Sequence, residues 1–316
     1  MEIIVLDGHT LNPGDLSWDP VSKFGRLTVY ERTPPEKIIE RVGGSEIVLT
    51  NKTPLSRGVF EKCKNIKFVS VLATGYNVVD VGAAKEFGVV VSNVPSYGTA
   101  AVAQFTFALL LEVCHNARRH ADSVAEGRWA RSEDFCYWDY PLIELAGKTF
   151  GIVGYGSIGK AVAKIAAAFG MNVITSDPEY KMQSDNVKPA GLDELLSSSD
   201  VISLHCPLNS ATDKIINADS ISKMKDGVIL INTSRGRLAD ENAVRDALDS
   251  GKIYFYAADV VSEEPIRPDN PLLAAKNILI TPHIAWAPRE SRGRLMETTS
   301  RNIEAFLRGE PVNRVN

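Results

Sequence analysis

An arginine, a glutamate and a histidine each come soon after a strand-like run in the second half of the chain. They are Arg235, Glu264 and His283. An arginine can bind a carboxylate through two hydrogen bonds and polarise the carbonyl beside it. A histidine exchanges protons near neutral pH, and a nearby carboxylate orients its ring and stabilises its charged form. Each residue alone could be an ordinary surface residue, but together they predict a site for proton and hydride exchange beside a bound carboxylate.

A glycine-rich turn in the middle of the chain has the spacing of a dinucleotide-binding turn. Gly154, Gly156 and Gly159 follow the apolar run 149–153 and open an alanine-rich helical stretch, residues 158–169. In such turns the glycines allow, in order, the tight turn, the close approach of the diphosphate and the packing of helix on strand. The helix N-terminus offers N–H groups to the anion. The predicted cofactor-binding residues of this turn are Gly154, Tyr155, Gly156, Ser157, Ile158 and Gly159.

The choice of dinucleotide depends on an acid further along the chain. Asp177 ends the next strand-like run and lies 23 residues after Gly154. An acid about 20 residues after the first glycine hydrogen-bonds the ribose diol of NAD. Its charge would repel the 2′-phosphate of NADP, so we expect NAD and regard NADP as less favoured. Lys181 is the nearby cation that keeps NADP open.

Strand-like and helical stretches alternate along the chain, which is the pattern of parallel βαβ units. The predicted strands of a first series are residues 3–6, 27–30, 47–50, 68–72 and 89–92, with helices at 35–42, 56–63 and 80–87. The six predicted strands of a second series are residues 149–153, 173–176, 201–205, 228–232, 254–259 and 278–280. Ligands of open parallel sheets bind at the carboxyl ends of the strands, where the three chemical residues are expected.

Two longer helical stretches flank the second series. One covers residues 99–126 and leads into an aromatic, irregular stretch at 129–140; the other covers residues 288–308. We expect an α/β fold of two doubly wound parallel-sheet domains, with a Rossmann-type NAD domain inserted into a flavodoxin-like substrate domain. The predicted boundaries are 1–98 and 288–316 for the substrate-binding (catalytic) domain and 99–287 for the NAD-binding domain.

The composition is that of an ordinary globular protein. The 316 residues are 44% hydrophobic and 23% charged, and the net charge of −4 gives no reason to expect nucleic acid or an anionic membrane as partner. The apolar stretch 100–114 is shorter than the ~20 residues that span a bilayer. The first residues are strand-like, unlike a signal peptide, and the four cysteines are too scattered for a metal site or redox pair. We expect a cytoplasmic protein without a metal.

The chain resembles the D-isomer-specific 2-hydroxyacid dehydrogenases over nearly its whole length, and within them the glycerate dehydrogenase (hydroxypyruvate reductase) branch. The resemblance rests on residues 73–80 (Ala-Thr-Gly-Tyr-Asn-Val-Val-Asp), the glycine turn, 205–208 (His-Cys-Pro-Leu), 232–236 (Asn-Thr-Ser-Arg-Gly), 259–265 and 281–286 (Thr-Pro-His-Ile-Ala-Trp). Many relatives have glycine two residues after the histidine, where this chain has Ala285 followed by Trp286. This version is similar to the glycerate dehydrogenase branch.

The resemblance implies a role for each motif. Arg235 would bind the carbonyl and carboxylate of a 2-oxo acid, and His283, paired with Glu264, would be the general acid for its reduction. The other implied substrate-binding residues are Ala73, Thr74, Gly75 and Trp286. The other implied NAD-binding residues are Thr99, Cys206, Pro207, Thr233 and Asp259. The aromatic stretch is similar to a dimerisation arm, so a homodimer through residues around 100–145 is expected; the alternative is a loop buried within one subunit.

Two other functions remain open. One is a 3-phosphoglycerate dehydrogenase without a regulatory domain, since only 33 residues follow His283; Lys52 and Arg57 are candidate cations for the phosphate. The other is a non-catalytic, corepressor-like protein that senses NAD and could keep the same residues. Hydroxypyruvate, glyoxylate, pyruvate and a phosphorylated analogue share the groups that Arg235 and His283 would bind, so the substrate's side chain stays open.

Overall fold

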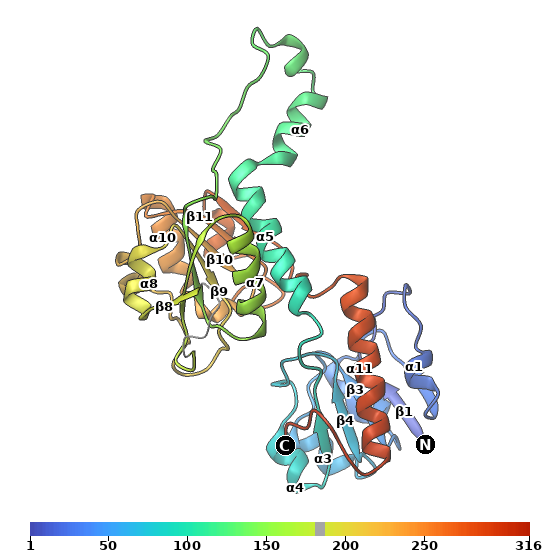
Figure 1. The fold of residues 1–316 in the computed structure, drawn as a ribbon. Coiled ribbons are helices and arrows are strands. Elements are labelled where there is room, and N and C mark those ends of the chain that lie inside the picture. The colour runs from blue at the N-terminus through green and yellow to red at the C-terminus, as the bar shows by residue number, and fades with distance from the viewer. Residues whose placement is uncertain (181–186) are drawn as a thin grey trace. The chain divides into compact units, whose positions relative to one another are not determined.

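The computed structural model describes residues 1–180 and 187–316, and the chain divides into two compact units. The first unit consists of Met1–Gly98 together with Trp286–Asn316, and the second unit is Thr99–Ala285. The second unit is therefore an insertion in the first, as the colours of Figure 1 show. Each unit is built around its own parallel β-sheet.

The first unit contains a five-stranded parallel sheet in the order β2-β1-β3-β4-β5. Of its three inner strands, β3 and β4 are buried along their whole length, as expected where helices cover both faces of a parallel sheet. The strands are β1 (Glu2–Val5), β2 (Arg26–Val29), β3 (Ile47–Thr50), β4 (Phe68–Val71) and β5 (Val90–Ser92). The helices are α1 (Asp19–Ser22), η1 (Pro35–Lys37), α2 (Ile38–Val42), α3 (Arg57–Lys62), α4 (Val81–Glu86) and α11 (Arg289–Leu307).

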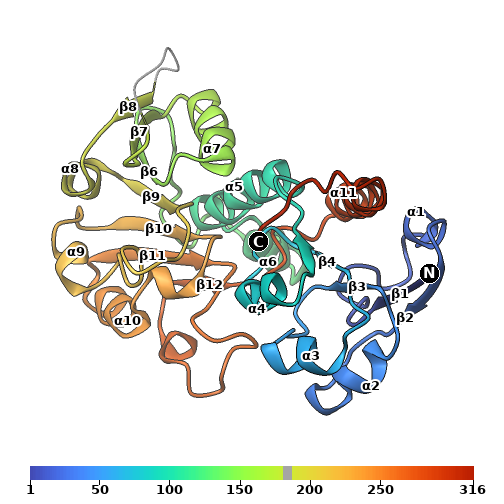
Figure 2. The same ribbon diagram turned by 90° about the horizontal axis from the view of Figure 1, so that it is seen from below.

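The two faces of this sheet carry separate cores. Helices α2, α3 and α4 cover one face, and α1 and α11 cover the other (Figure 2). Helix α11 comes from the far end of the sequence, and it buries Leu295, Met296 and Ile303 while Phe306 stacks on Phe68 at 4.6 Å between ring centroids. The last residues of the chain thus complete a core that the first residues begin.

The second unit contains a seven-stranded parallel sheet in the order β12-β11-β10-β9-β6-β7-β8. Its core lies on both faces, with α5 and α7 on one side and α8, α9 and α10 on the other. The strands are β6 (Thr149–Val153), β7 (Asn172–Ser176), β8 (Val187–Pro189), β9 (Val201–Leu204), β10 (Val228–Asn232), β11 (Ile253–Ala258) and β12 (Ile278–Ile280). The helices are α5 (Thr99–His115), α6 (Ala117–Ala125), η2 (Trp129–Arg131), α7 (Ser157–Ala168), α8 (Leu192–Ser198), α9 (Ala218–Ser222), η3 (Gly236–Leu238), α10 (Glu241–Ser250) and η4 (Pro271–Ala274).

The structure departs from the predicted elements in two places. The sheet of the second unit has a seventh strand, β8, which the prediction omitted because its three residues include a lysine and a proline. Proline is tolerated there because β8 lies at the edge of the sheet, where a ladder N–H can be missing. The predicted helix 99–126 is wrong as one helix, because Asn116 takes a left-handed conformation (φ 47°) and separates α5 from α6. Asparagine tolerates that conformation better than most residues.

Helices α5 and α6 meet at a bend of 54°. No single helix among the described residues is long and apolar enough to cross a membrane, although these two would pass that test of length and composition if taken together. Half of α5 is buried in the core of the second unit, whereas α6 has no buried residue. Figure 1 shows α6 and the segment after it extending away from the sheet of their own unit; residues 117–145 are called the arm below.

Candidate active site

The three chemical residues lie on loops that follow neighbouring strands of the second unit's sheet. Arg235 follows β10, Glu264 follows β11 and His283 follows β12. Strands β10, β11 and β12 are neighbours, and Asn232 at the end of β10 pairs with Ala258, which pairs with Ile280 at the end of β12. Because the three strands are parallel, the loops that follow them begin side by side. The alternation of predicted strands and helices was sufficient to predict that the three residues lie at the carboxyl ends of parallel strands.

Glu264 and His283 are in direct contact. The Nδ1 atom of His283 lies 2.7 Å from Oε2 of Glu264, and the two side chains are 27% and 35% exposed. A proton on Nδ1 satisfies this hydrogen bond, and the contact fixes the orientation of the ring. The arrangement makes Nε2 the ring nitrogen that can exchange a proton with a bound molecule.

The backbone of His283 is held in an uncommon conformation. Its φ is 54°, in the left-handed region that few residues other than glycine adopt. The carboxylate of Asp259, 1% exposed, accepts hydrogen bonds from the Thr281 hydroxyl at 2.6 Å and from the N–H groups of Ile284 and Ala285 at 2.9 and 2.8 Å. Three hydrogen bonds to one buried carboxylate fix both sides of the histidine, so the imidazole has a defined position before any ligand binds.

Arg235 lies on a loop that the end of its own strand supports. Asn232, which is fully buried, donates from Nδ2 to the carbonyl of Arg235 at 2.9 Å, and its Oδ1 accepts from the N–H of Ser234 at 3.1 Å. The guanidinium is exposed and donates to the carbonyl of Ser234. Among the described residues of the second unit, no carboxylate lies within ion-pair distance of it, so its charge is available to an anionic ligand.

The glycine turn has the geometry that a dinucleotide needs. Gly154 has φ 95°, and a Cβ there would lie 2.4 Å from the backbone N of Cys206; a Cβ on Gly159 would lie 2.3 Å from the carbonyl O of Gly154. A Cβ on Gly156 would meet no atom within 4 Å, so this glycine borders open space at the N-terminus of α7. No side chain of residues 1–180 or 187–316 caps that helix, which leaves its first N–H groups for an anion such as a diphosphate.

Asp177 stands at the end of β7, beside the glycine turn. Its Oδ2 accepts the N–H of Tyr155 at 2.6 Å, and its Oδ1 accepts the N–H of Glu179 at 2.9 Å. A carboxylate can accept about four hydrogen bonds, so these two orient it and leave capacity for a ribose diol. Lys181 lies outside the described residues.

The other predicted NAD-binding residues surround the same strand ends. Cys206 is buried two residues after the end of β9, where burial raises the pKa of its thiol to about 11, and Pro207 follows it. Thr233 is buried after β10, and its hydroxyl lies 3.1 Å from that of Thr106 on α5. Thr99 is the first residue of α5. Cys206 and Thr233 therefore lie at the carboxyl ends of neighbouring strands, β9 and β10.

A second histidine near this edge has different chemistry. His205 follows β9, and its Nε2 lies 2.8 Å from the hydroxyl of Ser203. Burial lowers the pKa of His205 to about 3, so its imidazole is neutral at physiological pH. A group that stays neutral in this way is poorly suited to exchange protons near pH 7, whereas His283 has a carboxylate partner.

The substrate-binding residues predicted in the first unit lie after β4 and before α11. The carbonyls of Ala73 and Thr74 accept hydrogen bonds from Val94 and Asn93, and the Thr74 hydroxyl donates to the carbonyl of Val94. Within the described part of the first unit, the N–H groups of residues 73–75 have no acceptor. Trp286 packs edge-on against Tyr97, with ring centroids 6.4 Å apart.

The prediction missed the buried residues that hold the loops. Asp259 was expected to line the NAD site, and the structure shows that both its oxygens support the segment around His283. Asn232 had no expected role, although a fully buried amide at the end of an apolar strand was a visible signal. Polar residues at such positions need partners, and here the partners are the loops that carry Arg235 and His283.

Comparison with known proteins gives the family. Residues 107–285 match the family model described as "D-isomer specific 2-hydroxyacid dehydrogenase, NAD binding domain". The chain is 57% identical over 322 aligned positions to the hydroxypyruvate reductase of Blautia hydrogenotrophica, with all of both chains covered. It is 41% identical over 287 positions to the glycerate dehydrogenase of Methylorubrum extorquens, covering 90% of each chain.

A solved structure gives the same result for the fold. The apo-structure of D-lactate dehydrogenase from Escherichia coli matches with a TM-score of 0.84 and 30% sequence identity over the full length of both chains. The match confirms the two-domain α/β fold, and the sequence comparisons confirm the resemblance drawn from the motifs. The chain belongs to the D-isomer-specific 2-hydroxyacid dehydrogenases and is an NAD-dependent oxidoreductase that acts on CH–OH groups.

Proposed function

We propose that this chain reduces hydroxypyruvate to D-glycerate with NADH, and catalyses the reverse oxidation. The observation that carries the proposal is the 2.7 Å contact between His283 and Glu264, on loops beside the one that bears Arg235. This arrangement supports proton transfer to a carbonyl oxygen next to a bound carboxylate. The two curated relatives described above, a hydroxypyruvate reductase and a glycerate dehydrogenase, support the substrate.

In the proposed reaction each residue has one task. Arg235 binds the carboxylate and carbonyl of the 2-oxo acid through its planar fork of donors. His283 donates a proton from Nε2 to the substrate oxygen in the reductive direction and takes it back in oxidation. Glu264 holds the ring through Nδ1 and stabilises its protonated form. NADH, when bound, supplies the hydride.

We propose that the second unit, from Thr99, binds NAD and that the first unit binds the substrate. The glycine turn from Gly154 to Gly159 would hold the diphosphate, with Asp177 on the adenosine ribose. Thr99, Cys206, Pro207, Thr233 and Asp259 would line the rest of the NAD site. The N–H groups of Ala73, Thr74 and Gly75, which have no acceptor in the described part of the first unit, support a role in binding the substrate carboxylate, and Trp286 would shape the substrate pocket.

The structure gives less support to a phosphorylated substrate. Arg57, one of the two cations considered for a phosphate, makes a two-hydrogen-bond pair with Glu86 at 2.7 and 2.8 Å. A guanidinium already bound by a carboxylate would have to lose that partner before it could bind a phosphate. We therefore favour the unphosphorylated 2-oxo acid.

We propose that the protein is a homodimer formed through the arm and α5. The arm keeps its shape by its own contacts: Arg128 pairs with Asp139, and the Ser123 and Tyr137 hydroxyls lie 2.6 Å apart. Yet it exposes large apolar side chains, which is unusual for a surface that stays in water. These are Val124, Trp129, Phe135, Trp138 and Leu142, exposed by between 42% and 89%.

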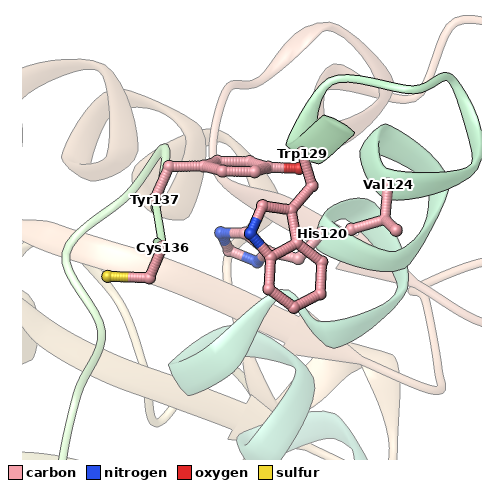
Figure 3. Close-up of a pocket in the computed structure, with 5 residues that line it drawn as sticks. All are labelled: His120, Val124, Trp129, Cys136 and Tyr137. Carbon is pink, nitrogen blue, oxygen red and sulfur yellow. The ribbon is translucent and has the colours of Figure 1, made fainter. Parts of the chain in front are cut away.

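A hollow on the arm fits the same proposal. Figure 3 shows it between the rings of His120, Trp129 and Tyr137, with Val124 and Cys136 at its sides. An apolar side chain of a second copy could fill it. The exposed aromatic residues also argue against the alternative of a loop buried within one subunit.

The dimer is tested by the mass of the protein in solution. Light scattering should give about twice the 34.5 kDa of one chain. The Trp138→Glu variant should fall toward one chain mass, because a charge would have to be buried in the interface. Leu307→Glu, at an exposed leucine on α11, is the matched control and should keep the mass of the unmodified protein. A monomeric unmodified protein would exclude the proposal.

We also propose that the chain works in the cytoplasm. All four of its cysteines are free thiols, and three of them are buried, which suits a reducing compartment. Fractionation of the source cells with an antibody to the protein would test this; recovery outside the cytoplasmic fraction would contradict it.

The substrate is tested by turnover of four 2-oxo acids. The purified protein is assayed with hydroxypyruvate, glyoxylate, pyruvate and 3-phosphohydroxypyruvate, each with NADH and with NADPH. We expect the highest kcat/KM with hydroxypyruvate and NADH. A higher value for 3-phosphohydroxypyruvate would move the assignment to a phosphoglycerate dehydrogenase. Tight NADH binding without turnover of any of the four would favour a non-catalytic sensor.

A further inference from the structure

One acid outside the predicted site holds the loop that carries Glu264. Glu241 is the first residue of α10, and its carboxylate accepts three hydrogen bonds from the segment 262–270. Its Oε1 accepts the N–H of Ser262 at 2.7 Å. Its Oε2 accepts the Ser262 hydroxyl at 2.7 Å and the Nδ2 group of Asn270 at 3.0 Å. One carboxylate therefore gathers both ends of a nine-residue loop, and Glu264 lies between them.

Glu241 is not needed for the ordinary task of an acid at a helix start. The N-terminus of α10 is capped by Asp240, which accepts the N–H groups of Asn242 and Ala243. Among the described residues of the second unit, Glu241 forms no ion pair. In the described part of the chain, every hydrogen bond of its carboxylate comes from the loop 262–270. The carboxylate therefore acts to hold this loop.

The same loop is pressed against the loop of Arg235. A Cβ on Gly236 would lie 1.9 Å from the carbonyl carbon of Val261 and 2.4 Å from the backbone N of Ser262, so the two backbones touch. The N–H of Val261 also faces Oε1 of Glu264 at 3.4 Å. The position of Glu264 is thus set between a backbone contact on one side and the carboxylate of Glu241 on the other.

We propose that Glu241 is a positioning residue for the Glu264–His283 pair. By holding Ser262 and Asn270, it keeps Oε2 of Glu264 at hydrogen-bond distance from Nδ1 of His283. It touches neither substrate nor cofactor and acts on the reaction only through Glu264. This inference rests on the proposed function of that pair in proton transfer.

The Glu241→Gln substitution tests the proposal with little change of shape. An amide has one acceptor oxygen, so whichever way it turns, its NH₂ group faces a donor of Ser262 or Asn270. With NADH and the best of the four 2-oxo acids, kcat should fall by about tenfold, since small displacements of catalytic groups cost this much or more. The KM for NADH should not change. Glu241→Asp, which keeps a carboxylate, should recover part of the loss.

A double-mutant cycle separates positioning from general stability. Glu264→Gln alone should lower kcat, and adding Glu241→Gln to it should cause no further loss, because the path through Glu264 is already broken. Glu263→Gln is the matched control: it changes the neighbouring acid, whose nearest cation is Arg267 at 3.7 Å, and should leave kcat unchanged. An equal loss of kcat from Glu241→Gln in both backgrounds would overturn the proposal.

The two proposals fail in different ways. If Glu264→Gln leaves kcat unchanged, the proposed function of the pair is wrong. If Glu264→Gln lowers kcat while Glu241→Gln does not, the proposed function stands and the role of Glu241 is wrong. Thermal unfolding of each variant checks that the assayed protein is folded; a Glu241→Gln protein that loses NADH binding together with kcat would also count against a role confined to Glu264.

Discussion

The glycine turn and the loops of Arg235, Glu264 and His283 lie at the ends of strands in one sheet, yet they are fixed by different means. The turn is shaped by missing side chains, because a Cβ on Gly154 or Gly159 would collide with backbone atoms. The loops share one such contact, at Gly236, but they are held mainly by side chains: Asn232, Asp259 and Glu241 each hydrogen-bond the backbone of a loop.

This difference decides what substitutions should do in each region. The backbone contacts at Gly154 and Gly159 leave no room for a side chain, so a substitution at either glycine should destabilise the fold as well as weaken cofactor binding. A loop held by hydrogen bonds can shift by a fraction of an ångström and leave the fold intact while the reaction slows. Substitutions in the turn should therefore change stability or the Kd for NADH, whereas substitutions in the loops should change kcat and the KM for the 2-oxo acid.

The largest expected effect comes from the imidazole itself. His283→Ala should lower kcat by about a thousandfold, because general acid–base catalysis is lost. The Kd for NADH should stay near that of the unmodified protein, because His283 lies on the loop after β12 and not in the glycine turn that would hold the diphosphate. Stopped-flow turnover and fluorescence titration with NADH measure the two quantities. A kcat near that of the unmodified protein would show that His283 is not the general acid. It would also contradict the expectation that substitutions in the loops, unlike those in the glycine turn, slow the reaction.

Two alanine substitutions divide the glycine turn into its structural and its binding positions. Gly154→Ala should destabilise the fold by more than about 2 kcal/mol, because its Cβ meets backbone and its φ is 95°. Gly156→Ala should leave stability unchanged, since its Cβ meets no protein atom, and raise the Kd for NADH about tenfold. Urea unfolding and NADH titration of both variants provide the comparison. Equal stability of the two proteins would contradict the account of the turn.

Arg235→Lys tests whether Arg235 acts mainly in binding the substrate, while His283 and Glu264 act in proton transfer. A lysine keeps the charge and loses the planar fork, so KM for the 2-oxo acid should rise about tenfold with a smaller change in kcat. Steady-state kinetics at saturating NADH measure both constants. A KM equal to that of the unmodified protein would exclude carboxylate binding by this residue.

The smallest expected effect concerns His205, a half-buried histidine at a strand end that has no part in the proposed reaction. Burial lowers its pKa from 6.5 to about 3. The unfolded chain therefore binds a proton that the folded protein does not between these values, and stability falls as the pH drops through this window. His205→Gln should reduce the stability lost between about pH 7 and about pH 4.5, measured by urea unfolding. An unchanged loss would show that other groups control this acid sensitivity.

Sequence periodicity was sufficient for most of the fold and for the positions of the three chemical residues. Parallel sheets place all strand ends at one edge, so the order of strand and loop already brings Arg235, Glu264 and His283 near one another. The 2.7 Å contact of Glu264 with His283 could be expected from the resemblance but not from spacing, because 19 residues separate the two.

What the sequence could not reveal is the support behind the loops. Glu241 and Ser262, or Asp259 and Ala285, are about 20 or more residues apart, and no local pattern marks them as partners. The break at Asn116 was not predicted for a similar reason. Asparagine is tolerated inside helices, and only its left-handed backbone conformation separates α5 from α6. Strand β8 was missed because three residues are too few for alternation to be visible.

The insertion of one unit into the other also sets an order of events during synthesis. Leu295, Met296 and Ile303 of α11 cover one face of the first sheet, and Oδ1 of Asn316 accepts the N–H of Val91 in β5. A ribosome makes α11 after the inserted unit, so the first unit cannot complete its core until the inserted unit has been translated. The inserted unit has all its strands in one uninterrupted stretch and can fold while the chain is still growing. We expect a nascent chain stopped before α11 to protect the inserted unit from protease and to leave residues 1–98 open to cleavage.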